Sequence, residues 1–304
     1  IEGINESCEK DTFELVAKST DDFEITKYEW TGYDDFKDKD TLKAYVTSNQ
    51  TFYVKVTDKH NCYNSASHNV DSKAYPKLIL DAPSYVCYGN SAIVSVKGAS
   101  TYKWVSDKEI TQRSFVDVPE KDTTYIVQGT TNGCTSTDSI SVNVKELPEI
   151  KIESENNISS ICLNDSIILK GQGGISYTWN TGATNNQIVV HPLVDTKYTV
   201  TGKDNFGCTN NAEFTVRINA LPNFEIKGQE LVCEGDVDTL WIEGDPATYT
   251  WVSHADVITD TLKHAIDKDQ LFKVKAVNEN NCISFQTKTV KMKKYPTINI
   301  NAPT

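Results

Sequence analysis

Hydrophobic and polar residues alternate with a period of two along most of this chain, as in Glu213-Phe214-Thr215-Val216-Arg217-Ile218. This period places successive side chains on opposite faces of a β-strand. The third quarter of the chain predicts strands at 149–152, 166–170, 177–179, 188–190, 196–201 and 213–218. Such short, β-branched segments, separated by turns such as Asn180-Thr181-Gly182 and without helical periodicity, predict an antiparallel sandwich.

The pattern recurs four times. A Tyr-x-Trp sequence occurs at 28–30, 102–104, 177–179 and 249–251, and the prolines at 76, 148, 222 and 296 are spaced by 72 or 74 residues. A fixed period of this kind indicates an array of one small unit. We therefore predict an all-β tandem array of four Ig-like antiparallel β-sandwich domains forming an extended rod. The expected repeats are 1–75 (divergent), 76–147, 148–221 and 222–295, with 296–304 as the start of a truncated fifth.

The Tyr-x-Trp segment is the expected core strand of each repeat. Its tryptophan should fill the space between two sheets, because a Trp has this role in the immunoglobulin fold. The predicted core tryptophans are Trp30, Trp104, Trp179 and Trp251. A second aromatic position recurs 9 or 10 residues before the second cysteine of each repeat, at Tyr53, Tyr125, Tyr198 and Phe272.

Two cysteines flank the tryptophan of every repeat. A unit of about 75 residues buries only about 60–65% of its unfolded surface, so a covalent staple is expected. Pairing within each repeat would keep it autonomous, and we predict Cys8–Cys62, Cys87–Cys134, Cys162–Cys208 and Cys233–Cys282, clasping one end of each sandwich. Zinc is the alternative, but the chain has no CxxC or CxxH pair. Disulfides indicate an oxidising compartment.

Charge and hydropathy exclude several classes. The net charge of −12 and the pI near 4.9 argue against nucleic acid and anionic membrane as partners. No apolar run approaches the ~20 residues of a spanning helix, and Ile1 begins no signal-peptide pattern. The segment from Tyr295-Pro296 to Ala302-Pro303 repeats that from Tyr75-Pro76 to Ala82-Pro83, so we expect a mature or excised piece of a longer chain.

The third repeat resembles a known family. Residues 177–184 (Tyr-Thr-Trp-Asn-Thr-Gly-Ala-Thr), 196–200, 205–208 and Leu221-Pro222 are similar to the Ig/PKD-like repeats of Bacteroidota surface proteins. These repeats fill the giant gliding-motility adhesins and other cargo of the type IX secretion system. The second and fourth repeats match at their Cys, Trp, Tyr and Pro positions. The first departs, with a Cys-to-Trp segment five residues longer and Thr31-Gly32-Tyr33 at the turn.

No pattern in the chain predicts catalysis. The histidines at 60, 68, 191, 254 and 264 share no repeat position, and no Glu or Cys stands at ligand spacing from them. Nucleophile elbows, HExxH sequences and phosphate-binding loops are absent from the sequence. We therefore expect neither an enzyme nor a cofactor.

Acidic residues gather in the first repeat, at Asp21, Asp22, Glu24, Asp34, Asp35, Asp38 and Asp40. Calcium requires six to eight converging oxygens, and these residues lack the loop register of an EF-hand. Solvated charge is the favoured interpretation, with a calcium site as the alternative.

Trp241 lies outside the repeated pattern. Alternation points it outward beside an inward Leu240, so it is a candidate ligand contact, for instance with a sugar, against packing on a neighbouring loop or repeat. The resemblance further implies O-glycans on Asp-Ser/Thr followed by a small or aliphatic residue. The matching positions are Thr41, Thr123, Ser139, Ser166, Thr239 and Thr261.

These observations predict an extracellular, cell-surface stalk segment of a bacterial adhesin. Its expected partners are a surface polysaccharide or another extracellular ligand, together with the rest of a larger repeat protein, with no nucleic acid and no membrane insertion. The alternatives are spacer modules in a secreted multidomain hydrolase and, from Trp241 alone, a carbohydrate-binding module.

Overall fold

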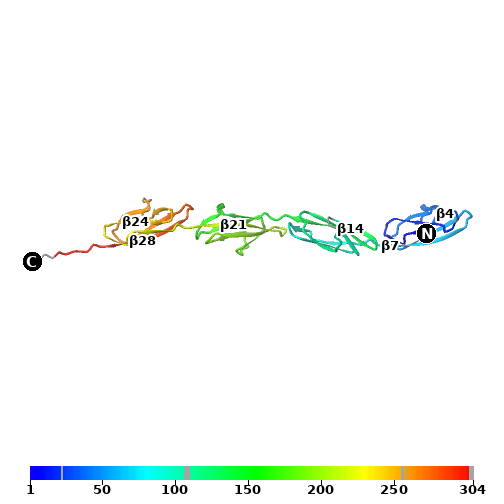
Figure 1. Cartoon of the computed structure of the whole chain (residues 1–304), viewed down its shortest axis with the longest axis horizontal. Helices are drawn as coiled ribbons and strands as arrows, with labels where there is room; N and C mark the ends of the chain where they lie inside the picture. The colour runs from blue at the N-terminus through cyan, green and yellow to red at the C-terminus, as the bar shows by residue number, and fades with distance from the viewer. Residues whose placement is uncertain (22, 106–109, 255–256, 258, 301–304) are drawn as a thin grey trace. The chain divides into compact units, whose positions relative to one another are not determined.

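The computed structural model describes residues 1–21, 23–105, 110–254, 257 and 259–300, apart from the side chain of Asp34. Its secondary structure is almost entirely β, with two short 3-10 turns, η1 (Asp34–Phe36) and η2 (Glu155–Asn157). The chain divides into two compact units, Ile1–Glu146 and Leu147–Thr304. Figure 1 colours these units from blue to green and from green to red. Each unit contains two sandwiches.

Sandwich 1 packs a three-stranded sheet of order β1-β3-β5 against a four-stranded sheet of order β2-β7-β6-β4. Its strands are β1 (Glu2–Gly3), β2 (Glu6–Cys8), β3 (Phe13–Val16), β4 (Ile25–Trp30), β5 (Thr41–Ala44), β6 (Gln50–Asp58) and β7 (Tyr63–Lys73). Sandwich 2 has the orders β8-β10-β12 and β9-β14-β13-β11. Its strands are β8 (Ile79–Asp81), β9 (Tyr85–Cys87), β10 (Ala92–Lys97), β11 (Thr101–Trp104), β12 (Ser114–Asp117), β13 (Thr123–Thr131) and β14 (Cys134–Lys145).

The second unit repeats this arrangement. Sandwich 3 has the orders β15-β17-β19 and β16-β21-β20-β18. Its strands are β15 (Lys151–Ser154), β16 (Ser160–Cys162), β17 (Ile167–Gln172), β18 (Ser176–Trp179), β19 (Gln187–Val190), β20 (Thr196–Lys203) and β21 (Thr209–Asn219). Sandwich 4 has the orders β22-β24-β26 and β23-β28-β27-β25. Its strands are β22 (Phe224–Lys227), β23 (Leu231–Cys233), β24 (Val237–Gly244), β25 (Thr248–Trp251), β26 (Thr261–Ala265), β27 (Gln270–Val277) and β28 (Ile283–Lys293).

One strand pairing departs from the antiparallel pattern in every sandwich. The short strand that ends in the first cysteine runs parallel to the last strand, with Cys8 in register with Lys73 and Cys162 in register with Asn219. The other strand pairs are antiparallel. The four Ig-like sandwiches predicted from the alternation are therefore present, and the parallel strand places the first cysteine beside the point where the chain leaves each sandwich.

Trp30, Trp104, Trp179 and Trp251 are all buried between the two sheets, as predicted. Each indole N–H is satisfied by a backbone carbonyl in the segment that follows, for example Trp179 Nε1 to Asn185 O at 2.9 Å and Trp251 Nε1 to Thr259 O at 3.1 Å. This bond matters because a buried indole N–H without an acceptor would cost about 1–3 kcal/mol.

In sandwiches 2 and 3, the tyrosine of Tyr-x-Trp closes the turn that precedes its own strand. The Tyr177 hydroxyl donates to the Gly174 carbonyl at 2.7 Å and accepts the Gly174 N–H at 2.9 Å. Tyr102 makes the same pair of bonds with Ala99, both at 2.8 Å. In these two sandwiches the Tyr-x-Trp tripeptide therefore supplies both a buried core residue and the residue that closes the turn.

The recurring second aromatic position is buried in three sandwiches and exposed in the first. Tyr125, Tyr198 and Phe272 are buried, but Tyr53 is 54% exposed and Phe52 takes the core position. Strand alternation decides which face a residue is on, whereas the distance from the second cysteine differs by one residue between sandwiches. This distance is one residue shorter in sandwich 2 because its hairpin is tighter, with Thr131 paired directly with Cys134.

Candidate functional site at the sandwich junctions

The first cysteine of sandwiches 1 and 3 lies where the chain leaves the sandwich. Cys8 ends β2 opposite Lys73, the last residue of β7, and the Glu9 N–H donates to the Lys73 carbonyl at 2.9 Å. In sandwich 3, Cys162 is paired with Asn219, and the Leu163 N–H donates to the Asn219 carbonyl at 2.9 Å. Local strand pairing therefore holds each of these thiol positions at the exit of its sandwich.

In sandwiches 1, 3 and 4, the second cysteine lies in a hairpin turn that is organised by an Asp or Asn side chain. Asp58 Oδ1 accepts from the N–H groups of His60 (2.8 Å) and Cys62 (2.9 Å), and Asn278 Oδ1 accepts from Asn280 (3.1 Å) and Cys282 (2.9 Å). The hydrogen bond from the Cys62 N–H, followed by that from His60, lowers the pKa of Asp58 below its ordinary value. The side chain thus fixes the positions of Cys62 and Cys282.

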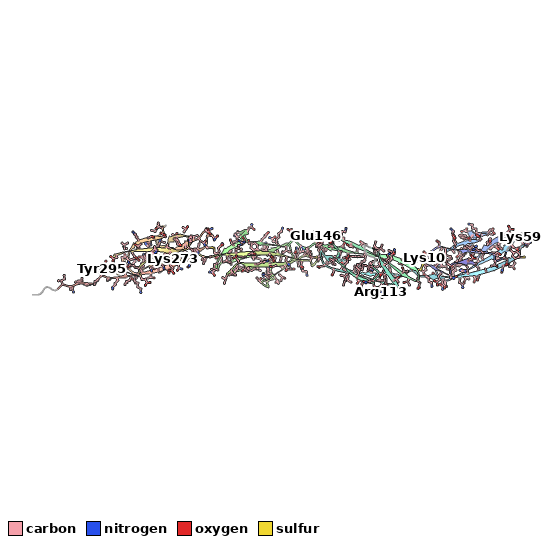
Figure 2. All side chains as sticks on the ribbon, viewed as in Figure 1. Lys10, Lys59, Arg113, Glu146, Lys273 and Tyr295 are labelled. Carbon is pink, nitrogen blue, oxygen red and sulfur yellow. A yellow bond between two sulfur atoms is a disulfide. The ribbon has the colours of Figure 1, made fainter. Side chains whose placement is uncertain are left out.

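The two cysteines of one sandwich are at opposite ends of it. The strand that joins them in sandwich 1, β7, has 11 residues and spans about 35 Å at ~3.3 Å per residue. Figure 2 shows the same separation through two neighbours, with Lys59 at one end of sandwich 1 and Lys10 at the other. A disulfide requires Cα atoms within about 7 Å.

The predicted pairing within repeats is therefore wrong. Cys8 is bonded to Cys134 of sandwich 2 and not to Cys62, with a Cα–Cα distance of 5.8 Å. Cys162 is bonded to Cys282 of sandwich 4 and not to Cys208, at 5.5 Å. Cys87 and Cys208 are also disulfide-bonded. The Cys8–Cys134 and Cys162–Cys282 bonds link successive sandwiches instead of clasping one end of each.

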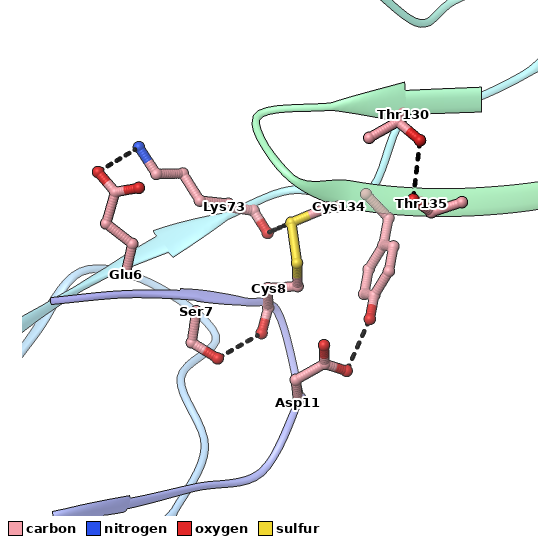
Figure 3. The surroundings of a disulfide bond; sticks show 9 residues. Glu6, Ser7, Cys8, Asp11, Lys73, Thr130, Cys134 and Thr135 are labelled. Atoms are coloured by element: carbon pink, nitrogen blue, oxygen red, sulfur yellow. Dashed lines mark hydrogen bonds and ion pairs between the residues drawn. A yellow bond between two sulfur atoms is a disulfide. The ribbon is translucent and has the colours of Figure 1, made fainter. Parts of the chain in front are cut away.

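Figure 3 shows the junction between sandwiches 1 and 2. Cys134 Sγ lies 3.7 Å from the Lys73 carbonyl oxygen, so the hairpin turn of sandwich 2 rests on the last residue of β7. Lys73 Nζ forms an ion pair with Glu6 at 3.1 Å, which ties together the two parallel strands. Cys282 Sγ repeats the first contact, 3.9 Å from the Asn219 carbonyl oxygen.

The segment that connects two successive sandwiches contacts both of them. The Tyr75 hydroxyl donates to Asp11 Oδ1 at 2.6 Å, and this hydrogen bond raises the pKa of Tyr75. Beyond Pro76, Leu78 is buried against Gly129, where an added Cβ would come within 2.4 Å of its side chain. In the second unit, Asn278 Nδ2 donates to the Ala220 carbonyl at 2.9 Å and Ser284 Oγ to the Pro222 carbonyl at 2.6 Å.

These bonds change how tension would pass along the chain. The Cys8–Cys134 bond joins residues 126 positions apart, and the Cys162–Cys282 bond joins residues 120 apart. When force is applied outside the two bonded cysteines, it passes through the disulfide and not through the residues between them. Residues 9–133 and 163–281 cannot be extended while the bonds persist.

Trp241 is on the outer face of β24, 41% exposed, beside the fully buried Leu240. Its indole N–H donates to Glu243 Oε1 at 2.9 Å, which holds the ring along the strand. Thr261 is directly opposite it on β26. The outward orientation agrees with the alternation, and the site presents one aromatic face with a carboxylate at its edge.

The candidate O-glycosylation residues differ in accessibility. Ser139, Ser166 and Thr239 are exposed, whereas Thr41, Thr123 and Thr261 are half-buried. The Asp238 that precedes Thr239 is itself buried, and its Oδ1 accepts the Thr239 N–H at 2.8 Å. Thr239 and Thr261 both lie near Trp241 in the strand register, so a glycan on either would lie close to the indole.

No group of three or more His, Cys, Asp or Glu side chains that could hold a metal ion occurs among the described residues. Of the acidic set in the first repeat, Asp22 and the side chain of Asp34 lie outside the described part. The histidines are dispersed except for His254 and His264, whose ring centroids are 4.6 Å apart. Within the described residues, no helix is long and apolar enough to cross a membrane.

The chain matches no protein-family model and no curated protein sequence. Solved structures with a similar chain trace include the N-terminal eight Ig domains of Down Syndrome Cell Adhesion Molecule isoform 1.30.30. That match has 12% identity and a TM-score of 0.37, and it covers 97% of this chain and 49% of the other, so the chain spans about half its length. The D1–D4 ectodomain fragment of ICAM-5 has 8% identity, coverages of 96% and 98%, and a TM-score of 0.38. A Ca²⁺-stabilized adhesin of an Antarctic bacterium, which helps it reach out and bind ice, has 11% identity, coverages of 93% and 94%, and a TM-score of 0.34.

Proposed function

We propose that this chain is a non-catalytic, extracellular segment of a bacterial surface adhesin that carries tension between the cell and an attached ligand. The observation that carries the proposal is the bonding of successive sandwiches by Cys8–Cys134 and Cys162–Cys282. Disulfides within each domain would be enough to stabilise the domains of a passive spacer. Bonds between successive domains also prevent the enclosed chain from being pulled out.

An extracellular location is supported by the disulfides, which persist in oxidising compartments. The acidic composition, with a net charge of −12, suits a chain that stays soluble next to its own copies. The repeat boundaries at residues 75, 147, 221 and 295 and the rod-like form are part of the same proposal. Small-angle scattering of the whole chain tests the rod, since a globule would contradict it.

Single-molecule force spectroscopy tests the mechanical role. Pulled from its ends in oxidising buffer, the chain should lack the unfolding steps of residues 9–133 and 163–281. After reduction it should show four steps, each of about 25 nm, because ~75 residues extend at roughly 3.6 Å each. The Cys62→Ser/Cys233→Ser variant, which keeps the bonded cysteines, is the matched control and should behave like the unaltered chain. Full-length unfolding steps in the oxidised chain would contradict the proposal.

The finer assignment rests on the resemblance of residues 177–184, 196–200 and 205–208 to Bacteroidota repeats. We propose that the parent protein is exported by type IX secretion and acts in surface attachment or gliding. A parent reading frame that continues with many such repeats would support this assignment. A modest chain with a catalytic domain would instead favour the hydrolase-spacer alternative.

A second candidate function is carbohydrate binding at Trp241, favoured by the exposed indole beside Glu243. Exposed aromatic rings can stack on sugars and anchor partners. Trp241→Ala should then remove signals from a glycan array. Phe285→Ala, which removes another half-exposed ring from the same sandwich, is the matched control. An unchanged binding profile in Trp241→Ala would eliminate this candidate.

A further inference from the structure

An open cavity of about 570 Å³ lies in sandwich 1. Its wall comes from β4 and β5, which are edge strands of the two sheets, and from the segment that connects them. Figure 1 labels β4 in this sandwich. Sites for small ligands typically have volumes of ~300–1,000 Å³. The aromatic and charged residues of the wall are Tyr28, Phe36, Asp38, Lys39, Asp40 and Lys43.

The connecting segment is held in place by backbone hydrogen bonds. The Asp38 N–H donates to the Tyr28 carbonyl on β4 at 2.8 Å, and the Lys39 carbonyl accepts the indole N–H of the core tryptophan at 3.1 Å. The Asp40 carbonyl accepts from the Ala17 N–H, just beyond β3, at 2.8 Å. Because these bonds tie the segment to both sheets, the cavity is formed in the free chain, which lowers the entropic cost of binding a ligand.

This segment is longer in sandwich 1 than in sandwich 3. The carbonyl that accepts the core indole N–H is nine residues after the tryptophan in sandwich 1 and six residues after it in sandwich 3. The longer segment contains η1, which ends at Phe36. The Phe36 ring is half-buried against the core, and Lys39 Nζ lies 5.4 Å from its centroid. The ring is therefore a fixed part of the cavity wall.

The tyrosine of Tyr-x-Trp has a different role in sandwich 1. In sandwiches 2, 3 and 4 its hydroxyl donates to a carbonyl of the preceding turn, that of Ala99, Gly174 or Asp245. The Tyr28 hydroxyl has no hydrogen-bond partner within the part of the chain that the structure describes. Burial, and then the charge of Asp40, raise the pKa of Tyr28. The phenol and the carboxylate are thus close together in one wall, and the hydroxyl is available to a ligand.

The charged groups of the wall cancel. They are two carboxylates and two ammonium groups, those of Asp38, Asp40, Lys39 and Lys43. Lys43 also pairs with Glu14 at 3.1 Å, and Asp38 acts on Lys27, so the charges just beyond the wall are again one of each sign. Neither an anion nor a cation is favoured by this balance. A neutral molecule rich in hydroxyl groups suits it, because carboxylates accept and ammonium groups donate hydrogen bonds.

We propose that this cavity binds a neutral saccharide, with the Phe36 ring against one face of a pyranose and with the Tyr28 hydroxyl and the Asp40 carboxylate bonded to its hydroxyl groups. Aromatic rings of this kind supply a large apolar face for such contacts. This binding role rests on the proposed adhesin function, for which it names the chemical class of the ligand. It is independent of Trp241, which belongs to sandwich 4.

The first test applies the whole oxidised chain to a glycan array that carries neutral, amino-sugar, uronic-acid and sialylated oligosaccharides. The unaltered chain should bind neutral members. In titrations with the strongest of these, Asp40→Ala should weaken binding at least about tenfold, since it removes hydrogen bonds to a charged acceptor. Phe36→Ala should weaken it by a similar factor. Asp35→Ala, at an exposed carboxylate of η1 outside the cavity wall, is the matched control and should bind normally.

Three outcomes of this test would overturn the proposal. They are the absence of binding to any neutral saccharide, binding to charged saccharides alone, and equal affinities for Asp40→Ala and Asp35→Ala. Loss of binding in Trp241→Ala but not in Asp40→Ala would assign the saccharide to sandwich 4 instead. The force-spectroscopy result does not depend on this cavity, so a failure here leaves the mechanical role intact, and a failure there leaves the binding site intact.

A second test compares the same change in two sandwiches. Tyr28→Phe should weaken binding at least about threefold, because it removes one hydrogen bond to the saccharide. It should leave the urea midpoint of sandwich 1 in place, since the hydroxyl has no partner among the described residues. Tyr177→Phe should do the reverse, lowering the urea midpoint of sandwich 3 and leaving binding unchanged, because its hydroxyl bonds Gly174. Unchanged binding in Tyr28→Phe, or equal losses of binding in the two variants, would contradict the role of the Tyr28 hydroxyl.

Discussion

Sandwiches 3 and 4 share one strand order and one Trp-centred core, yet one paired position in their interiors changes from apolar to polar. In sandwich 3, Ile167 on β17 faces Val190 on β19, and both are buried. In sandwich 4 the same pair is Asp238 and His264. Asp238 is 3% exposed, and its Oδ2 has no hydrogen-bond partner among the described residues. The repeat thus tolerates a buried carboxylate where its neighbour has a branched aliphatic side chain.

This comparison separates what holds the two sandwiches together from what makes them different. The Cys162–Cys282 disulfide joins the two sandwiches, so its loss should affect both. Each sandwich also has its own buried tryptophan, so equivalent substitutions of the two tryptophans should cause similar losses of stability. The Asp238–His264 pair belongs to sandwich 4 alone, so changes there should act on one sandwich. Pulse-labelling hydrogen exchange along a urea titration measures the free energy of unfolding of each sandwich separately.

The largest effect is expected from Cys162→Ser, which removes the bond shared by the two sandwiches. A loop with a sequence separation of 120 corresponds to a loss of about 4–5 kcal/mol on the chain-entropy account. Sandwiches 3 and 4 should then unfold at separate urea concentrations. Cys233→Ser, which removes an unbonded thiol, is the control and should leave the transition in place. Matching shifts in the two variants would contradict the structural role of the bond.

Trp179→Ala and Trp251→Ala should each destabilise their own sandwich by about 3–5 kcal/mol, because a large buried ring leaves a cavity. Both rings are buried and both indoles are hydrogen-bonded, so the two losses should be similar. Trp241→Ala is the matched surface change and should lie within about 0.5 kcal/mol of the unaltered chain. The measurement is the urea midpoint of each sandwich, and a loss for Trp241→Ala as large as the others would refute the assignment of faces.

Asp238→Ile should stabilise sandwich 4 by about 1–3 kcal/mol, since it removes a buried acceptor that has no partner among the described residues. The reverse change, Ile167→Asp, should destabilise sandwich 3 by at least as much. Asp238→Asn keeps the size and the polarity and should have the smallest effect of the three. A destabilised Asp238→Ile variant would indicate that the carboxylate has a partner and supports the fold.

The smallest effect is a pH dependence confined to sandwich 4. Burial, and then the charge of His264, lower the pKa of His254 in the folded state. The unfolded chain therefore binds more protons near pH 6, so the stability is fully present above the unfolded pKa of about 6.5 and is lost as the pH falls below it. Hydrogen exchange in β26 and β27, corrected for intrinsic rates, should show this loss, and His254→Gln should remove it. Sandwich 3, whose single histidine His191 is exposed, should not respond.

Much of the architecture could be predicted from the sequence because it depends on local periodicity. Alternation over six to eight residues identifies the strands, and the Tyr-x-Trp sequence identifies the core strand in every sandwich. The exposed Tyr53 shows that spacing from the cysteine does not identify the core position, since one tighter hairpin shifts the spacing while leaving the alternation intact. The burial of Asp238 was not predicted because the flanking Val237 and Thr239 are typical strand residues. Asp238 is five residues after Cys233, as Ile167 is after Cys162, and this spacing would have identified it as a core position.

The sequence by itself determined that this protein is a tandem array of Ig-like sandwiches with tryptophan cores and paired thiols, because these features follow from repetition and from the two-residue period of a strand. The partner of each cysteine was decided by the tertiary structure. The parallel strand holds the first cysteine at the exit of its sandwich, and the last strand, about 35 Å long, holds the second cysteine at the entrance. A disulfide reaches only about 7 Å between Cα atoms, so the bonds of Cys8 and Cys162 cross to the next sandwich.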